Sequence, residues 1–346
     1  MQKRVSLKDI ATKVGVSTAL VSYVLNGLEK EKRVGAEVVK KIRLAAEELN
    51  YQPNQIARSL RMKTTKTIGL IVADIANPFF GQLARIIENE ANTFGYTVII
   101  GCSDEDELKS EALITTLLNR QVDGFIIVPA AGTNAQIQSL LKRHIPVVLV
   151  DRFFEDVNTS HVIIDNFKAT SEATSYFISK GLKKIAMVAY KSPLSHMKDR
   201  IKGYADTMKV NNLADNICIV EVRYEHFQED LDIAFKELVV EKKKVNALLF
   251  ATNALSVAGL YFVQKQKLKI PDDVAFIGFD GGDSFELFNP PLSFVQQPIE
   301  NIGKEAINVL MRILNGSDEV SQITLSSSLI NRNSENRMND LERLKF

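Results

Sequence analysis

From Thr67 onward the chain repeats one pattern, in which a short and almost wholly apolar segment is followed by a stretch of helical periodicity. Strands that lack polar alternation are buried on both faces, as in a parallel sheet covered by helices. The apolar segments lie at 67–73, 96–102, 124–129, 146–151, 161–165, 184–190, 217–222, 247–252 and 274–280. They predict an α/β fold with doubly wound parallel sheets.

The length of this region indicates two lobes, because it exceeds the roughly 100–150 residues of a common domain. We expect two similar α/β lobes that face each other across a cleft within residues 67–334. Lobe 1 is expected in about 67–166 plus 297–320, and lobe 2 in about 167–294 plus 321–334. The polar remainder, 335–346, is predicted to be a flexible tail.

The N-terminal part carries helix signals instead. Ser6 can cap a first helix that Gly15 ends, and Ser17 can cap a second helix that Asn26-Gly27 closes. Two short helices joined by a tight turn form a helix-turn-helix, whose second helix enters the major groove of DNA. The alternative interpretation is a small helical domain with no role on DNA.

The second helix divides into two faces. Its apolar side is expected to pack inward through Leu20, Val21, Val24 and Leu25. Its outward side chains are Thr18, Ala19, Ser22 and Tyr23. Hydroxyl groups can bond a phosphate or a base edge, and an alanine can contact a thymine methyl group. This outward face is therefore the predicted DNA-reading surface.

A third amphipathic helix is expected from about Ala36 to Leu49, which completes an all-α domain in residues 1–52. The preceding charged loop can add phosphate contacts through Lys30, Lys32 or Arg33. Residues 53–66 are predicted to form a short hinge helix and a linker, because Pro53 stops the chain and Asn54 can cap a helix.

Charge is distributed unevenly along the chain, although the overall net charge is only +1. Residues 1–66 hold 14 Lys and Arg against 6 Asp and Glu, whereas the rest of the chain holds 29 against 36. A basic terminal module on a mildly acidic body indicates a polyanionic partner for that module alone. A solvated charged surface is the alternative explanation.

Nothing in the sequence predicts a membrane or secreted protein. No apolar run reaches the roughly 18 residues that a membrane helix needs, and the basic start has no apolar segment behind it. Cys102 and Cys218 lie far apart in apolar segments, so we interpret them as small buried hydrophobic residues. These features favour a reducing compartment, the cytoplasm.

The stretch VSLKDIATKVGVSTALVSYVLNG, followed by AAEELNYQPNQIARSLR, resembles the lactose-repressor family of bacterial transcription regulators. The βα pattern extends this resemblance to about Ser334. The resemblance implies a homodimer on a pseudo-palindromic double-stranded DNA operator and a core similar to periplasmic sugar-binding proteins. It also implies a regulator, in most cases a repressor, whose operator affinity is controlled by a sugar-like effector.

The resemblance also assigns roles position by position. It implies base reading by Thr18, Ala19 and Tyr23, with Ser17 and Ser22 near the phosphates. It implies a hinge helix in the minor groove, whose residues include Asn54, Ala57, Leu60 and Arg61. There a leucine, here Leu60, wedges into a base step, since the few kcal/mol lost on unstacking are offset by apolar contact and added phosphate contacts.

Tyr23 departs from the common family pattern, because many members carry arginine at this position. A tyrosine hydroxyl cannot make the bidentate pair that arginine makes with guanine. We therefore predict an operator half-site in which the base opposite Tyr23 is not fixed as guanine. Gly35 also replaces a common capping serine, which costs a few tenths of a kcal/mol.

Ligands of open α/β sheets bind beyond the carboxyl ends of the strands, so candidate effector residues are those that follow each strand. In lobe 1 these are Asn77, Phe79 and Phe80 after the first strand and Asp151 after the fourth. An aromatic ring there can stack on a sugar or base. A core phenylalanine pair is the alternative for Phe79 and Phe80.

In lobe 2 the same reasoning selects Arg200, Asn253 and Asp280 as polar groups for vicinal hydroxyls. Arg200 matches the family arginine that holds a ligand hydroxyl or carboxylate, and Tyr224 matches an aromatic position of the family's cleft. His196 lies one helical turn before Arg200 and can line the same wall, although a lone histidine is as often a core or surface residue.

An enzyme and a sugar-binding protein without DNA function are the competing interpretations. The sequence contains no G-x-S-x-G, H-E-x-x-H, Walker A or G-x-G-x-x-G motif. Its four histidines, His144, His161, His196 and His226, share no metal-like spacing with each other or with the cysteines. We therefore predict no catalytic residues, no metal site and no cofactor, and the basic N-terminal module argues against a binding protein alone.

Overall fold

The computed structural model describes residues 5–51, 64–242 and 244–335. The chain divides into two compact units, Met1–Thr65 and Lys66–Phe346. The four residues predicted for the hinge helix, Asn54, Ala57, Leu60 and Arg61, lie outside the described residues.

The described residues of the first unit form three helices, α1 (Leu7–Val14), α2 (Thr18–Leu25) and α3 (Ala36–Glu48). Ser6 and Asp9 form the capping box in front of α1. Gly15 ends this helix in the left-handed conformation, with φ of 77°. The helices enclose a small core built on Ile10, Val21, Val24, Ile42 and Ala45.

Lobe 1 of the second unit has a parallel six-stranded sheet in the order β11-β5-β4-β3-β1-β2. Its strands are β1 (Thr67–Val72), β2 (Thr97–Cys102), β3 (Gly124–Ile127), β4 (Val147–Val150), β5 (Ser160–Ile164) and β11 (Gln322–Leu325). Its helices are α5 (Pro78–Thr93), α6 (Glu107–Asn119), α7 (Asn134–Lys142) and α13 (Ile299–Leu314).

Lobe 2 has a second six-stranded sheet in the order β12-β10-β9-β8-β6-β7, in which only the β10–β12 pair is antiparallel. Its strands are β6 (Ile185–Tyr190), β7 (Cys218–Val222), β8 (Ala247–Phe250), β9 (Ala275–Phe279), β10 (Ser293–Gln296) and β12 (Ser328–Ile330). Its helices are α8 (Asn166–Ser179), α9 (Ser195–Val210), α10 (Phe227–Phe235), α11 (Asn253–Lys265) and α12 (Asp283–Glu286), with short turns of other helix types at Ala214–Asn216 and Lys236–Glu241.

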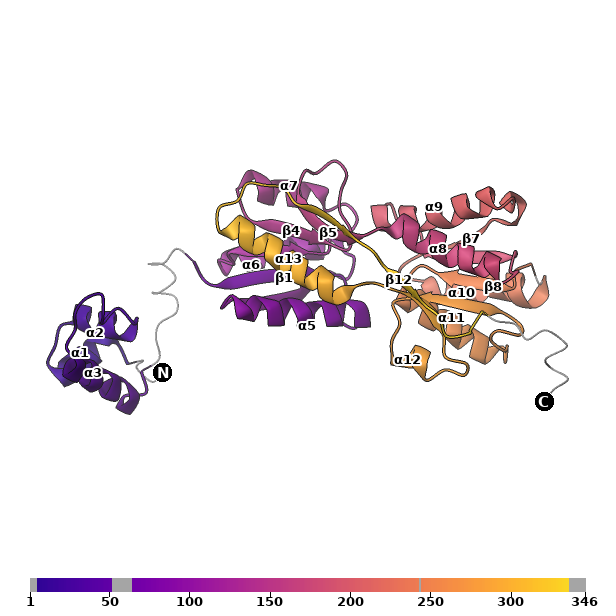
Figure 1. Ribbon diagram of the computed structural model, residues 1–346. Coiled ribbons are helices and arrows are strands. Elements are labelled where there is room, and N and C mark those ends of the chain that lie inside the picture. Colours follow the sequence, from indigo (N-terminus) through magenta and orange to yellow (C-terminus); the bar gives the residue numbers. More distant parts are fainter. Residues whose placement is uncertain (1–4, 52–63, 243, 336–346) are drawn as a thin grey trace. The chain divides into compact units, whose positions relative to one another are not determined.

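Both sheets are covered on both faces. In β3 the side chains of Phe125 and Ile127 join the cluster under α6 and α7, whereas Ile126 joins the cluster under α5 and α13. In lobe 2, α8 and α9 cover one face of the sheet, and α10 and α11 pack with the cluster on the other face. The predicted α/β fold class, two doubly wound lobes with an N-terminal helical domain, is confirmed (Figure 1).

The chain crosses between the lobes three times, from β5 to α8, from β10 to α13 and from β11 to β12. Figure 1 shows the yellow C-terminal segment passing from one lobe to the other. The last crossing corrects the expected boundary, since residues 322–325 pair with β5 of lobe 1 rather than joining lobe 2. β11 is a short edge strand with alternating burial, and such a pattern fits either sheet.

The expected start of the tail at residue 335 is also wrong. Glu335 is buried, and its carboxylate accepts hydrogen bonds from Tyr176 Oη at 2.9 Å and from Ser293 Oγ at 2.5 Å. A polar sequence gave no sign of these tertiary partners. Cys102 and Cys218 are free thiols and only partly buried, on edge strands. Within the described residues, no helix is long and apolar enough to cross a membrane.

Candidate functional site

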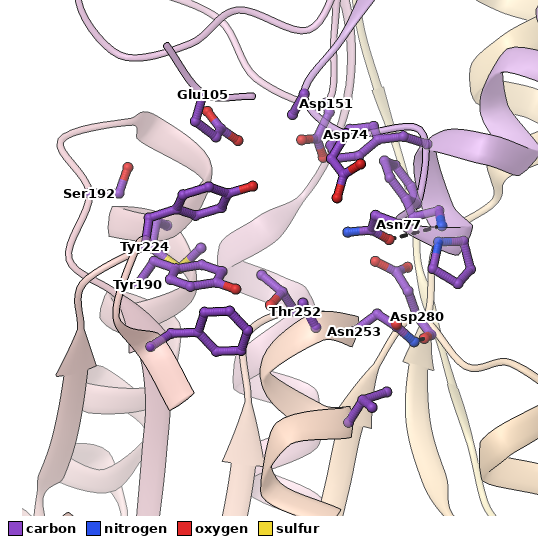
Figure 2. Close-up of a pocket in the computed structure, with 18 of the residues that line it drawn as sticks. Asp74, Asn77, Glu105, Asp151, Tyr190, Ser192, Tyr224, Thr252, Asn253 and Asp280 are labelled. Atoms are coloured by element: carbon purple, nitrogen blue, oxygen red, sulfur yellow. Dashed lines mark hydrogen bonds between the residues drawn. The ribbon is translucent and has the colours of Figure 1, made fainter. Parts of the chain in front are cut away.

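A cavity of about 890 Å³ lies in the second unit, with walls from both lobes. Lobe 1 contributes the loops after β1 and β4, and lobe 2 contributes the ends of β6, β7, β8 and β9 (Figure 2). All nine residues predicted for the effector site line it, namely Asn77, Phe79, Phe80, Asp151, His196, Arg200, Tyr224, Asn253 and Asp280. The structure thus brings together side chains that are widely separated in sequence, and their role in binding stays a prediction.

The loop after β1 is organised by Asn77, whose side chain caps α5 by accepting from the Phe79 N–H at 3.1 Å. Pro78 occupies the first turn of this helix, where it costs no hydrogen bond. Phe79 and Phe80 pack edge to face with their ring centroids 5.0 Å apart, and both are buried. These rings therefore serve the core and line the cavity at once.

Asp151 follows β4 in a left-handed conformation, with φ of 70°. Its carboxylate accepts from Arg152 Nε at 3.2 Å, and Arg152 Nη1 donates to Glu105 at 2.8 Å. Burial opposes the charge of Arg152, but the two carboxylates outweigh it and raise the pKa of this guanidinium. The positive charge of Arg152 is therefore balanced by two carboxylates of lobe 1. Glu105 was not predicted, because it comes from a loop whose sequence suggests only a turn.

Arg200 is 2% exposed on α9. Its Nε donates to Asn166 Oδ1 at 2.7 Å, its Nη1 donates to the Ala251 carbonyl, and its guanidinium lies 3.7 Å from the centroid of the Phe279 ring. Its Nη2 has no hydrogen-bond partner among the described residues. Burial lowers the pKa of this guanidinium, and the nearby Asp151 and Asp280 oppose that effect.

Asp280 follows β9, also with positive φ, at 53°. Its Oδ2 accepts from Gln297 Nε2 at 2.9 Å, whereas its Oδ1 is buried with no partner in the described part of the chain. Burial raises the pKa of this carboxyl to about 7, against the opposing effect of Arg200. Asn253 donates from its side chain to the Asp280 carbonyl, so it holds this loop in place (Figure 2).

His196 is buried beside two arginines. Burial, followed by the charges of Arg152 and Arg200, lowers its pKa well below the usual value, so the imidazole is neutral. Within the described residues its Nδ1 has no hydrogen-bond partner. The alternative of a satisfied core histidine does not fit this arrangement. A neutral imidazole can give or accept one hydrogen bond from a ligand.

Aromatic side chains line the other end of the cavity (Figure 2). Tyr224 is 37% exposed and packs on Tyr190 with ring centroids 5.3 Å apart, and Tyr190 also contacts Phe227. Burial raises the pKa of Tyr224 to about 12, so its hydroxyl is neutral. Sequence reasoning missed Tyr190, although it ends β6 and its position at a strand end was a usable signal.

The cavity is suited to a polar ligand. Four buried polar atoms in its wall lack partners among the described residues, namely Arg200 Nη2, Asp280 Oδ1, His196 Nδ1 and Gln297 Oε1. Each buried polar atom left unpaired costs about 1–3 kcal/mol. A ligand with several hydroxyl groups can satisfy these donors and acceptors together. In the described residues no cluster of His, Cys, Asp and Glu could hold a metal ion.

In the first unit, Thr18 and Ala19 of α2 are exposed, and Ser22 and Tyr23 are half-buried. Ser17 caps the helix by accepting from the Leu20 N–H at 3.2 Å. Asn26 donates to the Ser22 hydroxyl at 3.2 Å. The predicted apolar and outward faces of the helix are both present, since Val21 and Val24 are buried on the opposite side.

Lys32 of the following loop lies 5.9 Å from the centroid of the Tyr23 ring and pairs with Glu31 at 2.8 Å. Glu29 of the same loop accepts from Arg43 of α3 at 2.6 Å. Side chains of this loop are thereby joined to α2 and α3. The Lys32 ammonium group lies close to the outward side chain of Tyr23.

Residues 6–54 match the profile of the bacterial regulatory proteins of the lacI family. Residues 65–333 match the profile of periplasmic binding proteins and the sugar binding domain of the LacI family. The chain is 33% identical over 315 residues to the catabolite control protein A of Priestia megaterium, which covers 90% of this chain and 93% of that protein.

Solved structures of regulators are similar in fold to this chain. The lac repressor dimer bound to operator and the anti-inducer ONPF has a TM-score of 0.84 at 21% identity, covering 97% of this chain and 100% of that chain. A regulator from Alkaliphilus metalliredigens complexed with D-xylulofuranose has a TM-score of 0.69 at 27% identity, covering 78% and 98%. The profiles and relatives denote regulators rather than enzymes. This chain, with its helix-turn-helix and its two-lobed effector domain, belongs to the lacI family of DNA-binding bacterial transcription regulators.

Proposed function

We propose that this regulator binds a sugar or sugar derivative between its lobes and that occupancy of the cavity changes its affinity for an operator. The observation that carries the proposal is the pair of buried atoms Arg200 Nη2 and Asp280 Oδ1, which lack partners among the described residues and belong to residues that line one cavity between the lobes. A cation that donates and a carboxylate that accepts are the groups that read vicinal hydroxyls.

The effector class follows from the wall of the cavity. Asn77, His196 and Arg200 supply hydrogen bonds, and Phe79 and Tyr224 supply flat apolar surfaces. Sugar rings combine hydroxyl groups on their rim with an apolar face, so both kinds of wall find a partner. The D-xylulofuranose complex of the Alkaliphilus regulator supports this class.

On the DNA side we propose a homodimer that places two copies of α2 in the half-sites of a pseudo-palindromic operator. Ser17, Thr18, Ala19, Ser22 and Tyr23 are the proposed contacts, with Ser17 and Ser22 near phosphates. The operator-bound dimer of the lac repressor supports this assembly. A regulator of operator DNA works where that DNA is, so the expected compartment is the cytoplasm.

The proposed linkage acts through the predicted hinge helix and linker, residues 53–66, of which 53–63 lie outside the described residues. A helix of two turns is unstable alone in water, so a small change in its surroundings decides whether it forms. Effector binding that alters the angle between the lobes can therefore form or melt the hinge helix. Asn54, Ala57, Leu60 and Arg61 are the residues we expect to meet the minor groove.

The effector proposal is tested by a thermal-shift screen of the full chain with sugars and nucleobases. A ligand at about 100 times its dissociation constant stabilises the folded state by roughly 2.7 kcal/mol. We expect a sugar to raise the melting temperature of the wild type and to have no such effect on Arg200→Ala. A response to nucleobases but to no sugar would replace the proposed class.

The minor-groove proposal is tested by Leu60→Ala. Specific operator binding should weaken roughly 30-fold, about 2 kcal/mol, because the apolar wedge that offsets unstacking is lost. Binding to random DNA should barely change. Leu44→Ala, at an exposed leucine of α3, is the matched control. Equal losses on operator and random DNA would contradict the wedge.

A further inference from the structure

At two of the three lobe crossings, a side chain of the crossing segment forms a hydrogen bond with a residue that lines the cavity. Asn166 is the first residue of α8, two positions after β5 of lobe 1 ends. Gln297 follows β10 of lobe 2 and precedes Pro298 and α13 of lobe 1. Both side chains are buried, with 4% and 3% exposure. Neither residue is one of the nine predicted for the effector site.

Asn166 links lobe 1 to Arg200. Its Nδ2 donates to the carbonyl of Ile164, the last residue of β5, at 3.2 Å, and its Oδ1 accepts from Arg200 Nε at 2.7 Å. Thr170, one turn further along α8, donates to the Arg200 carbonyl at 2.7 Å. A displacement of the Arg200 guanidinium therefore acts on the backbone at the point where the chain leaves lobe 1.

Gln297 makes the corresponding link to Asp280. Its Nε2 donates to Asp280 Oδ2 at 2.9 Å, and its backbone N–H also bonds this carboxylate. Its Oε1 is buried without a partner in the described part of the chain. A side chain that served structure alone would be expected to pair both ends of its amide.

The two links have the same construction. In each, one atom of a charged residue that lines the cavity binds a crossing residue, and a second, buried atom of the same residue, Arg200 Nη2 or Asp280 Oδ1, has no partner among the described residues. Asn253 differs, because it holds the Asp280 carbonyl from within lobe 2. A ligand that bonds Arg200 Nη2 and Asp280 Oδ1 would therefore act on both crossings at once.

We propose that Asn166 and Gln297 are positioning residues that transmit occupancy of the cavity to the angle between the lobes. The inference rests on the proposed function only in taking the occupant to be the effector. The links are hydrogen bonds within the chain itself, so their coupling can be measured in the ligand-free protein.

The first experiment measures the distance between lobes by pulsed electron spin resonance. Spin labels are attached at Leu108→Cys on α6 and Val210→Cys on α9, two side chains that are 75% and 82% exposed, in a chain whose two cysteines are replaced by serine. We expect Asn166→Ala and Arg200→Ala each to shift or broaden the distance distribution. The double variant should change it no further, because both break one link.

Asp165→Ala is the matched control. Asp165 lies on the same crossing and caps α8 by accepting from the Lys168 N–H at 2.9 Å, but in the described residues no hydrogen bond joins it to Arg200. The change in the distance distribution caused by Asp165→Ala should add to the change caused by Arg200→Ala. Additive effects of Asn166→Ala and Arg200→Ala, or an unchanged distribution in Asn166→Ala, would overturn the proposal. If Asn166→Ala does not fold, the same comparison of single and double variants is made with Gln297→Ala and Asp280→Ala.

The second experiment adds D-ribose, D-xylulose or cellobiose, whichever raises the melting temperature of the wild type. At saturating sugar, Asn166→Ala and Gln297→Ala should each show less than half of the wild-type change in distance, with affinity reduced tenfold or less. A full change of distance in both variants would overturn the coupling. Failure of all sugars to bind would overturn the proposed effector class, while the ligand-free cycle still decides the coupling.

Discussion

The outward face of α2 and the cavity between the lobes present their chemistry in opposite ways. The proposed DNA contacts follow one another along two helical turns, and Thr18 and Ala19 are exposed to solvent. The cavity residues come from strand ends throughout the second unit, and Arg200 and Asp280 are buried. The proposed DNA-reading surface thus consists of residues that are neighbours in sequence. The cavity instead consists of residues far apart in sequence that the fold brings together.

The difference has an energetic consequence. On α2 each polar side chain can be solvated in the absence of DNA, so a substitution there affects affinity for DNA more than the stability of the fold. In the cavity, the buried Arg200 and Asp280 already make internal hydrogen bonds, and each leaves one polar atom without a partner among the described residues. Substitutions there are expected to change ligand affinity, pH dependence and lobe geometry together.

The largest expected effect is that of Arg200→Ala, which tests whether the cavity acts separately from the DNA-reading face. We expect effector affinity to fall by about 100-fold or more, since removing one partner of a buried charged contact costs roughly 2–5 kcal/mol. Operator affinity without effector should fall by less than this, because Arg200→Ala changes the distance between the lobes but leaves the DNA-reading face of α2 intact. Arg85→Ala, at an exposed arginine of α5, is the control. Loss of operator binding in the absence of effector would assign Arg200 a structural role instead.

The next effect concerns the DNA-reading face alone. Replacing Tyr23 with arginine should create a preference for guanine at one half-site position worth about 1–3 kcal/mol, because arginine makes the bidentate contact that tyrosine cannot. Operator selection with both proteins measures this preference. The response to effector should be unchanged in Tyr23→Arg. An invariant guanine at this position in the wild-type selection would contradict the interpretation of Tyr23.

The smallest effect is a pH dependence confined to the cavity. Burial raises the pKa of Asp280 from 3.8 to about 7, so between these values the folded protein holds a proton that the unfolded chain has released. Stability that depends on the neutral carboxyl is therefore complete below pH 4 and is lost as the pH rises to about 7, by at most about 1.4 kcal/mol per pH unit. Asp280→Asn should lack this loss.

Urea unfolding of both proteins at pH 5 and pH 7 measures this difference. Asp230→Asn is the control, because Arg223 lowers the pKa of Asp230 to about 2. The stability that this pair contributes is lost only as the pH falls toward 2, so the control should match the wild type between pH 5 and pH 7. Parallel pH profiles for the wild type and Asp280→Asn would contradict the raised pKa.

Much of the molecule could be predicted where the signal is local. The Ser6–Asp9 capping box, the left-handed Gly15 and the cap at Ser17 depend on residues within one turn of each other. The apolar strands were recognisable because burial on both faces removes polar alternation. The rule that ligands bind at strand ends then selected residues such as Arg200 and Asp280, which do line the cavity.

The errors and omissions share a cause. The edge strand β11 and the buried Glu335 have no distinctive local pattern, and their partners, β5 and the hydroxyls of Tyr176 and Ser293, are far away in sequence. Tyr190 and Gln297 also belong to the cavity wall, but only the pairing of strands shows which strand ends meet. Such contacts depend on which segments pack together.

By itself the sequence determined the helix-turn-helix, the α/β class of the body and the residue types available for a ligand, because caps, periodicity and burial patterns act over a few residues. The tertiary structure decided which polar atoms remain unpaired, that the pKa of Asp280 is raised, and that Asn166 and Gln297 join the cavity to the lobe crossings. Hydrogen-bond partners and desolvation are properties of the packed interior, and they exist only once distant segments have come together.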